Sequence, residues 1–180
     1  PLGVVGHAGR EPGLSRTRRP ADTAGLVLDG LGLQEAHTQP GGIHNSIVWL
    51  IWHAARQEDV QVAQLSGREQ VWSEGGWAQR LGIERGAEDF GFGDSAQDVG
   101  AVTTSSLEEL AAYLTEVTEA SARYAASLSD DEIAEVIDDS YDPPVTRGVR
   151  LVSTFEDAST HLGQAAYARS LVDSGWTIGF

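Results

Sequence analysis

The sequence contains no cysteine, no methionine and no lysine. Without cysteine the chain has no disulfide framework, no zinc site built on thiolates and no cysteine nucleophile. A chain without disulfides fits a reducing compartment, and we expect a cytoplasmic protein. Long apolar segments are also missing: the longest apolar run extends from Ile47 to Trp52, far short of the ~20 residues that a membrane-spanning helix requires. We therefore expect no membrane insertion.

Positive charge is scarce in this chain. Its 12 basic residues, all of them arginine, are outnumbered by 27 acidic residues, which gives a net charge of −15 at pH 7. Such a chain is repelled by phosphate backbones and by anionic membrane surfaces. Nucleic acid is therefore excluded as the main partner, and small molecules are the expected ligands.

The length of 180 residues corresponds to about one domain. Residues 1–20 carry scattered glycine, proline and arginine without an apolar period. We expect these residues to form a disordered or tag-derived tail. The folded domain is expected over residues 21–180.

Apolar residues recur at helical spacing in four segments: residues 21–36, 45–65, 105–127 and 149–172. Shorter helices or turns are expected within residues 67–82 and 129–139, the latter because Ser129 and Glu132 form a capping-box pattern. Residues 83–104 form a loop that is rich in glycine and acidic residues, and no segment alternates in the manner of a strand. These features predict an all-α fold. We expect an antiparallel four-helix bundle with short extra helices and a long acidic, glycine-rich crossover loop.

Three polar residues share helix faces with apolar residues. His53 lies in the middle of the helix expected at 45–65, and Asp157 and His161 are four residues apart in the helix expected at 149–172. Since four residues turn a helix by ~400°, Asp157 and His161 point to nearly the same side, ~6 Å apart. A histidine from a facing helix would complete a set of three metal ligands with open positions for water or substrate. The same aspartate and histidine would equally form a helix ion pair without any metal.

Four further residues are candidates for supporting roles. Gln164, three residues after His161, is placed to hydrogen-bond to a ligand on its own helix. Trp52 is adjacent to the candidate histidine of its helix and lines either the core or a substrate pocket. Arg150 and Arg169 are candidates to bind an anionic group of a substrate, although both could instead pair with surface carboxylates.

Several segments resemble the DinB-like superfamily, in particular an actinobacterial branch of small proteins. In chain order they are NSIVWLIWHAARQEDVQVAQLSGREQVW, GWAQRLG, DPPVTRGVRLVS and EDASTHLGQAAYARSLV. The resemblance implies a four-helix bundle with a divalent metal held by three side chains. The family's histidine of the second helix falls on His53, and its other two ligands, four residues apart just before a Gly-Gln pair, fall on Asp157 and His161. Many members have histidine at the first of these two positions, whereas the aspartate here is similar to that of the thiol-transferase relatives.

The resemblance also implies a chemistry, since its relatives include mycothiol-dependent isomerases and other thiol S-transferases. A metal ion lowers the pKa of a bound thiol, which provides a thiolate at neutral pH. We expect zinc first, with nickel, iron or manganese as alternatives, and a mycothiol-type thiol as co-substrate that is transferred to a small electrophile. The first alternative is a metal-dependent hydrolase, with Glu58 or Glu156 as general base if the fold turns either of them inward. The second is a non-enzymatic, stress-related bundle whose metal is structural or absent. A homodimer through the outer helix faces is compatible with each function.

Overall fold

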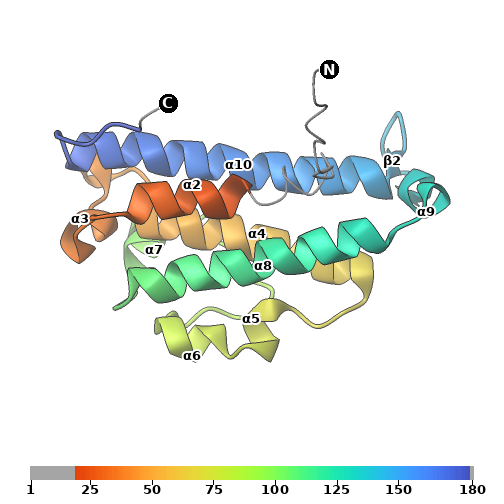
Figure 1. The fold of residues 1–180 in the computed structure, drawn as a ribbon, viewed down its shortest axis with the longest axis horizontal. Helices are drawn as coiled ribbons and strands as arrows, with labels where there is room; N and C mark the ends of the chain where they lie inside the picture. Colours follow the sequence, from red (N-terminus) through yellow and green to blue (C-terminus); the bar gives the residue numbers. More distant parts are fainter. Residues whose placement is uncertain (1–18, 179–180) are drawn as a thin grey trace, which may run out of the picture.

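The computed structural model describes residues 19–178, which are mostly helical (Figure 1). The bundle is formed by α2 (Arg19–Leu28), α4 (Ile47–Ser66), α8 (Leu107–Ser127) and α10 (Arg147–Val172). The shorter elements are α3 (Leu33–His37), η1 (Pro40–Gly42), α5 (Val71–Glu74), α6 (Trp77–Leu81), α7 (Ala96–Ala101), α9 (Asp130–Ala134), β1 (Val136–Asp138) and β2 (Val145–Thr146). The predicted all-α fold with four long helical segments is confirmed.

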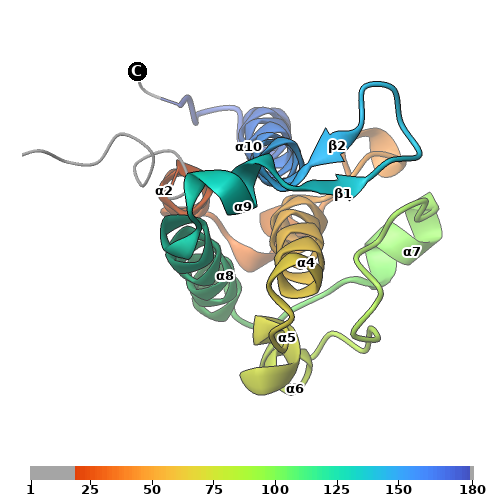
Figure 2. The same ribbon diagram turned by 90° about the vertical axis from the view of Figure 1, so that its right-hand side faces the viewer.

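The four bundle helices form a ring when viewed along their length (Figure 2). Helix α4 packs against α8 and α10, and α2 packs against the same two helices from the other side. Helices α4 and α10 run antiparallel, and so do α2 and α8 (Figure 1). Helices α4 and α8 are parallel, because the crossover of residues 67–106 returns the chain to the end of the bundle at which α4 begins. The bundle is thus antiparallel across two of its helix contacts and parallel across the other two.

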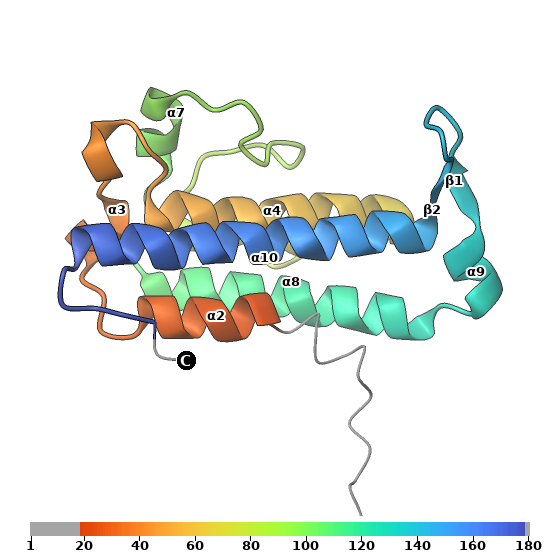
Figure 3. The same ribbon diagram turned by 90° about the horizontal axis from the view of Figure 1, so that it is seen from above.

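The crossover covers the outer side of α4. Its first part carries α5 and α6, and its second part, with α7, lies beside α4 on the side away from α2 (Figure 3). Helix α4 is therefore enclosed by α8, α10 and the crossover, and every residue from Ile47 to Val60 is buried. A helix that is buried all round normally carries few polar residues. The polar residues that α4 does carry are the ones that organise the site and its support.

Side-chain caps define the starts of the long helices α4, α8 and α10. The Ser46 hydroxyl accepts the Trp49 N–H at 3.1 Å at the start of α4, and Ser106 and Thr146 cap α8 and α10 in the same way. Helix α4 ends at Gly67, whose φ of 66° lies in the left-handed region that glycine adopts without strain. These caps satisfy N–H and carbonyl groups that a helix leaves unpaired at its ends.

Two predictions about local structure are wrong at their boundaries. The single helix expected over 21–36 is broken between Leu28 and Leu33, because the chain turns at Gly30 with a φ of 66°. Helix α2 also begins at Arg19, so the expected tail over residues 1–20 overlaps its start, and the rest of that tail lies outside the described residues.

The expectation of a chain without strands is also wrong. The capping box of Ser129 and Glu132 starts α9 as predicted, but this helix ends at Ala134. The chain then forms β1, which pairs antiparallel with β2 just before α10. Strands of three and two residues are too short to produce the apolar alternation by which strands are recognised in a sequence.

Arg56 joins α4 to the crossover from a fully buried position. Its guanidinium donates to Asp59 Oδ2 and to the Tyr113 hydroxyl, both at 3.1 Å, to Gln70 Oε1 at 3.0 Å and to the carbonyl of Ala87. The spacing of Arg56 and Asp59 predicts this ion pair. Because Gln70 and Ala87 lie in the crossover, one buried cation holds two separate stretches of it against the bundle.

Asp59 completes the same network. Its two carboxylate oxygens accept the backbone N–H groups of Val71 and Trp72, each at 2.8 Å, and the hydroxyl of Tyr113 at 2.9 Å. The two N–H groups are the first of α5, where a helix has donors without partners. The buried carboxylate is thus fully hydrogen-bonded, as a buried charge must be.

Glu58 is a buried acid of α4 without such partners. Its side chain is 0 % exposed, and neither carboxylate oxygen makes a hydrogen bond of ordinary geometry among the residues that the structure describes. Burial raises the pKa of Glu58 to about 8, against the opposing effect of the nearby Ser121 hydroxyl on α8. The carboxyl group is therefore protonated in the native protein at neutral pH.

Replacing Glu58 with glutamine is expected to remove a pH dependence of stability. Since the native pKa of about 8 exceeds the ordinary value of 4.5, the native state keeps a proton that the unfolded chain releases. The contribution of Glu58 to wild-type stability therefore falls as the pH rises from about 4.5 to about 8, by on the order of 5 kcal/mol. The variant stays neutral, so urea unfolding at about pH 9 is expected to show it as the more stable protein. Glu116→Gln on the exposed side of α8 is the control, and an unchanged pH profile in Glu58→Gln would contradict the prediction.

Candidate metal centre

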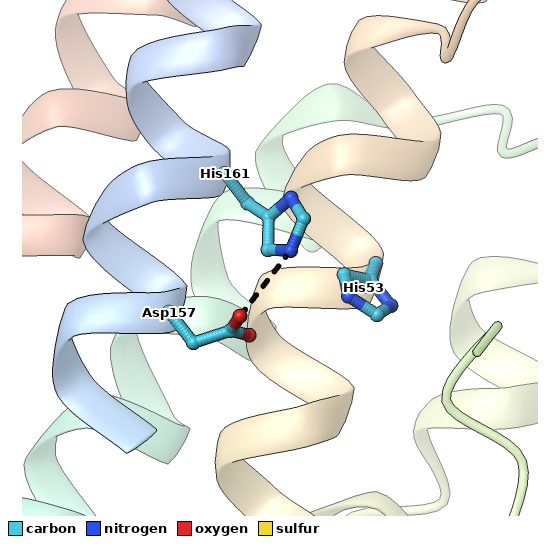
Figure 4. A group of neighbouring side chains, drawn as sticks. All are labelled: His53, Asp157 and His161. Atoms are coloured by element: carbon cyan, nitrogen blue, oxygen red, sulfur yellow. Dashed lines mark ion pairs between the residues drawn. The ribbon is translucent and has the colours of Figure 1, made fainter. Parts of the chain in front are cut away.

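His53 on α4 and Asp157 and His161 on α10 converge between the two helices (Figure 4). Each side chain offers one ligand atom, and the three atoms all lie within 4.8 Å of one another. Neighbouring ligands of a tetrahedral metal ion are about 3–4 Å apart. The three groups are therefore placed so that small side-chain movements would bring them onto one ion.

The packing of α4 against α10 is what brings these residues together. Asp157 and His161 are one turn apart on α10 and point to the same side, as their spacing predicts (Figure 4). His53 meets them from the antiparallel neighbour, and the rings of His53 and His161 lie 4.4 Å apart at 88°. Residue spacing predicts the pair on α10 and the family resemblance points to His53, and the packing of α4 against α10 brings the three together.

His53 is held in place by contacts with the crossover and with its own helix. Its Nδ1 donates to the backbone carbonyl of Phe90 in the crossover, which leaves Nε2 as the free nitrogen, and the Trp49 indole stacks on the ring at 4.6 Å. Burial lowers the pKa of His53 below its ordinary value, although the hydrogen bond to Phe90 opposes this effect. A neutral imidazole with one nitrogen fixed by a carbonyl is the form that binds metals.

His161 is oriented in the same way by its own helix. Its Nδ1 lies 3.0 Å from Gln164 Oε1, and its Nε2 faces Asp157 Oδ1 at 3.6 Å. The predicted contact between Gln164 and His161 is therefore present. Because Nδ1 is turned to the amide oxygen of its own helix, Nε2 is directed toward Asp157 and the space between the helices.

His161 and Asp157 lie within ion-pair distance, at 3.6 Å, which is longer than a hydrogen bond. His53 adds a third group from the facing helix, with its ligand atom within 4.8 Å of theirs. In both histidines Nδ1 lies against a carbonyl or amide oxygen, which leaves Nε2 on the side of the candidate site. Two imidazoles and one carboxylate are a donor set that fits a divalent ion such as zinc or iron.

The three residues lie in the wall of an open cavity of about 420 Å³. The α4 side of the cavity carries residues at a regular spacing of four, and the α10 side does the same. The lining residues are Trp49, His53, Gln57, Gln61, Phe90, Gly91, Phe92, Gly93, Ser153, Asp157 and His161. The cavity leaves room for a substrate beside a three-ligand site, as catalytic rather than structural metal sites do.

The third wall of the cavity is a loop of the crossover, residues 90–93. Asp94 fixes this loop by accepting the Trp49 indole N–H at 2.8 Å and by pairing with Arg85 at 3.0 Å. The same Arg85 guanidinium also pairs with Asp89, at 2.9 Å. The acidic residues of the crossover therefore position the loop that holds His53.

Sequence reasoning missed the loop and the two glutamines among the lining residues. The four-residue spacing of Trp49, His53, Gln57 and Gln61 is a signal that could have identified the glutamines, since these residues share one helix face. No signal points to the loop of residues 90–93, because its position depends on contacts with α4 that are distant in the sequence.

Trp52 does not line the cavity, contrary to one of the two roles expected for it. Its side chain is 0 % exposed and belongs to the main core cluster. Trp52 lies one position from His53, which turns it by ~100° away from the ligand face. The Trp52 indole instead packs against the loop at Gly91.

The two arginines expected to bind an anionic substrate are also engaged elsewhere. Arg150 pairs with Asp138 of β1 at 3.5 Å, which matches the alternative of pairing with a surface carboxylate. Arg169 is buried, donates to the carbonyl groups of Val27 in the last turn of α2 and of Asp29 just after it, and pairs with Asp173. Neither arginine lines the cavity.

Replacing Gly91 with alanine is expected to weaken metal binding about tenfold or more. A Cβ at Gly91 would lie 2.9 Å from Trp52 and 3.0 Å from Trp49, and the residue has a φ of 84°. The loop would have to move away from α4, and the Phe90 carbonyl would move with it from His53. Isothermal titration with Zn²⁺ measures the change.

Gly93→Ala is the matched control for this substitution. Gly93 has a similar φ of 81°, but a Cβ there would meet nothing within 4 Å. Both variants therefore carry the same backbone strain, and only Gly91→Ala carries the collision. Equal zinc affinity in the two variants would contradict a role of the loop in holding the histidine.

The fold and the site together define a four-helix bundle with a candidate two-histidine, one-carboxylate metal centre. The DinB superfamily matches residues 16–165 of the sequence, and the chain therefore belongs to the DinB superfamily. The structure is similar to the crystal structure of a conserved protein from Enterococcus faecalis, with a TM-score of 0.82 and 30 % sequence identity over 90 % of this chain and 95 % of that chain. No curated protein matches the sequence significantly.

None of the described helices combines the length with the apolar character that a membrane crossing needs. The expected actinobacterial branch stays a prediction.

Proposed function

We propose that this protein is a metal-dependent thiol S-transferase, in which His53, Asp157 and His161 hold a divalent ion. The observation that carries the proposal is the position of this donor set in the wall of an open cavity of about 420 Å³. A structural metal is normally closed off by four protein ligands, whereas three ligands leave a position for a reacting group. We expect zinc first, and nickel, iron or manganese as alternatives.

The proposed chemistry needs a thiol from outside the protein, since the chain has no cysteine. A bound divalent ion would lower the pKa of that thiol and so provide a thiolate at neutral pH. His53 and His161 would bind the ion through Nε2, because Nδ1 of each is already hydrogen-bonded. Asp157 would supply one negative charge and thereby keep the site less positive than three neutral ligands would.

The protein would also position the electrophile and limit the access of water. The rings of Trp49 and Phe90 flank His53, and Phe92 at the rim of the cavity is 88 % exposed. These aromatic groups offer an apolar surface beside the candidate metal position. A small electrophile with an apolar body would be held against them next to the thiolate.

Metal-dependent hydrolysis is the second candidate function, and a general base beside the candidate ion would favour it. Glu58 points into the bundle near Ser121, and Glu156 does not line the cavity. Among the described residues that line the cavity, Asp157 is the acidic one, and it belongs to the candidate ligand set. The proposal of thiol transfer needs no such base, since the ion itself would favour the thiolate.

The test is turnover with a defined thiol and electrophile. Zinc-loaded protein is incubated with monochlorobimane and either mycothiol, another low-molecular-weight thiol or no thiol, and the fluorescent adduct is measured. We expect adduct formation above the uncatalysed rate that requires both thiol and metal and is lost in His161→Ala. Hydrolysis of ester or amide substrates without thiol would favour the hydrolase. Metal-dependent thermal stabilisation without any turnover would favour the non-enzymatic bundle.

A further inference from the structure

The outer side of α10 carries apolar residues that no described helix covers. This side is opposite the candidate ligands, because His161 precedes Gly163 by two residues and two residues turn a helix by ~200°. Helices α10 and α2 lie side by side, and no described helix lies in front of them (Figure 3). Val152 and Tyr167 on this side of α10 are 56 % and 69 % exposed. Exposed apolar groups on one face are typical of a protein interface.

An open groove of about 520 Å³ lies on this side, between α10, α2 and the segment that follows α10. Small residues of α10 line it, among them Ser159, Gly163 and Ala166, together with the rings of Tyr167 and Trp176. A Cβ added at Gly163 would meet nothing within 4 Å, although a glycine inside a helix costs about 1 kcal/mol relative to alanine. Packing within one chain therefore does not require this glycine, whereas the close approach of a second helix would.

The groove is neutral although the protein is strongly acidic. The described residues that line it include no charged side chain, while the whole chain carries a net charge of −15. Two copies of the chain repel each other through their acidic faces. A face with little charge is therefore the one through which two copies can meet, and the groove lies on such a face.

We propose that a second copy of this chain docks on the groove, with the two α10 helices antiparallel and crossing at Gly163. A two-fold axis through Gly163 places Tyr167 of each copy opposite Ser159 of the other, so that each exposed ring enters the groove beside small residues. The same axis places Ser170 opposite Glu156, so that a neutral residue faces the carboxylate. Because each copy offers both the ring and the groove, the contact is self-complementary and closes as a dimer. Both candidate metal centres stay open on the far sides of the paired helices.

The first test is sedimentation equilibrium of the full chain over a range of concentrations. We expect a monomer–dimer equilibrium with a Kd of about 10 μM that becomes tighter as salt screens the repulsion between the copies. Gly163→Arg is expected to weaken dimerisation at least about 100-fold. Its dilute monomer should unfold no more easily than the wild type, since arginine is the better helix former. Gly86→Arg is the matched control and should dimerise like the wild type, because a Cβ there also meets nothing within 4 Å. A monomer at every concentration, or equal dimerisation of the two variants, would overturn the inference.

The absence of cysteine from the sequence allows a second test that detects the contact directly. Gly163→Cys puts one thiol of each copy at the two-fold axis, where the two Cβ atoms would lie within the disulfide range of about 4 Å. We expect mild oxidation to join most of the chains into covalent dimers. Gly86→Cys places its thiol at an exposed position of the crossover and should give only traces of covalent dimer. A similar yield from the two variants would overturn the crossing at Gly163, even if the copies associated through another face.

Discussion

Replacing His161 or Asp157 with alanine is expected to reduce zinc affinity by at least about 100-fold, since each change removes a ligand rather than one of its hydrogen-bond partners. The wild type is expected to bind about one equivalent of metal and to gain about 3 kcal/mol in unfolding free energy at a free zinc concentration of 100 times the Kd. The two variants should show no such gain at the same zinc concentration. Plasma mass spectrometry of the purified proteins and thermal unfolding with added zinc measure both effects.

Two further variants separate a metal site from a helix ion pair. Gln164→Ala removes the oxygen that accepts from His161 Nδ1, and we expect about a tenfold loss of affinity rather than a complete loss. His44→Ala changes a histidine outside the candidate group and should bind zinc like the wild type. If the wild type bound no zinc, nickel or manganese after reloading, the ion-pair interpretation of Asp157 and His161 would hold instead.

Replacing Arg56 with methionine is expected to lower the free energy of unfolding by about 3–5 kcal/mol, because Asp59 would remain buried without its cation. The same change removes the bonds to Gln70 and Ala87 that attach the crossover to α4. Zinc affinity should fall as well, since the loop that carries Phe90 follows directly after Ala87. Urea unfolding and zinc titration of the same variant measure the two effects.

Arg123→Met is the control for the loss of a charge. Arg123 is 64 % exposed and lies 3.8 Å from Glu119 on the outside of α8, and exposed pairs contribute at most about 1 kcal/mol. A loss in Arg56→Met no larger than in this control would show that the crossover folds onto α4 without its buried cation.

The position of the helices could be predicted largely from local features. The caps at Ser46, Ser106 and Ser129 each place a helix start within a residue or two, because a cap acts on N–H groups only two or three positions away. The break at Gly30 was missed because a glycine within an apolar period signals either a weak helix or its end. The strands were missed because pairing β1 with β2 requires a contact between separate segments.

The features of the candidate site also fall into two groups, those that local spacing predicts and those that depend on tertiary contacts. The spacing of Asp157 and His161 on one helix determined that the two side chains meet, and the position of Gln164 determined which of them it orients. Other features depend on neighbours distant in the sequence. Nε2 of His53 is free because Nδ1 donates to Phe90, Trp52 is buried in the core instead of lining the cavity, and Arg169 binds carbonyl groups at the end of α2. Residues 90–93 show this most clearly, since nothing within the loop itself predicts a wall of the cavity.

The sequence by itself therefore determined the helices, their caps and the pair of candidate ligands on α10, because each depends on interactions within one or two turns of a helix. The tertiary structure brought His53, which the family resemblance had named, to face that pair, and it decided which nitrogen of His53 is free and which residues line the cavity beside it. These properties arise when α4 is enclosed by α10 and the crossover. Because burial removes polar groups from water, most of them find partners, and these partners come from segments far apart in the chain.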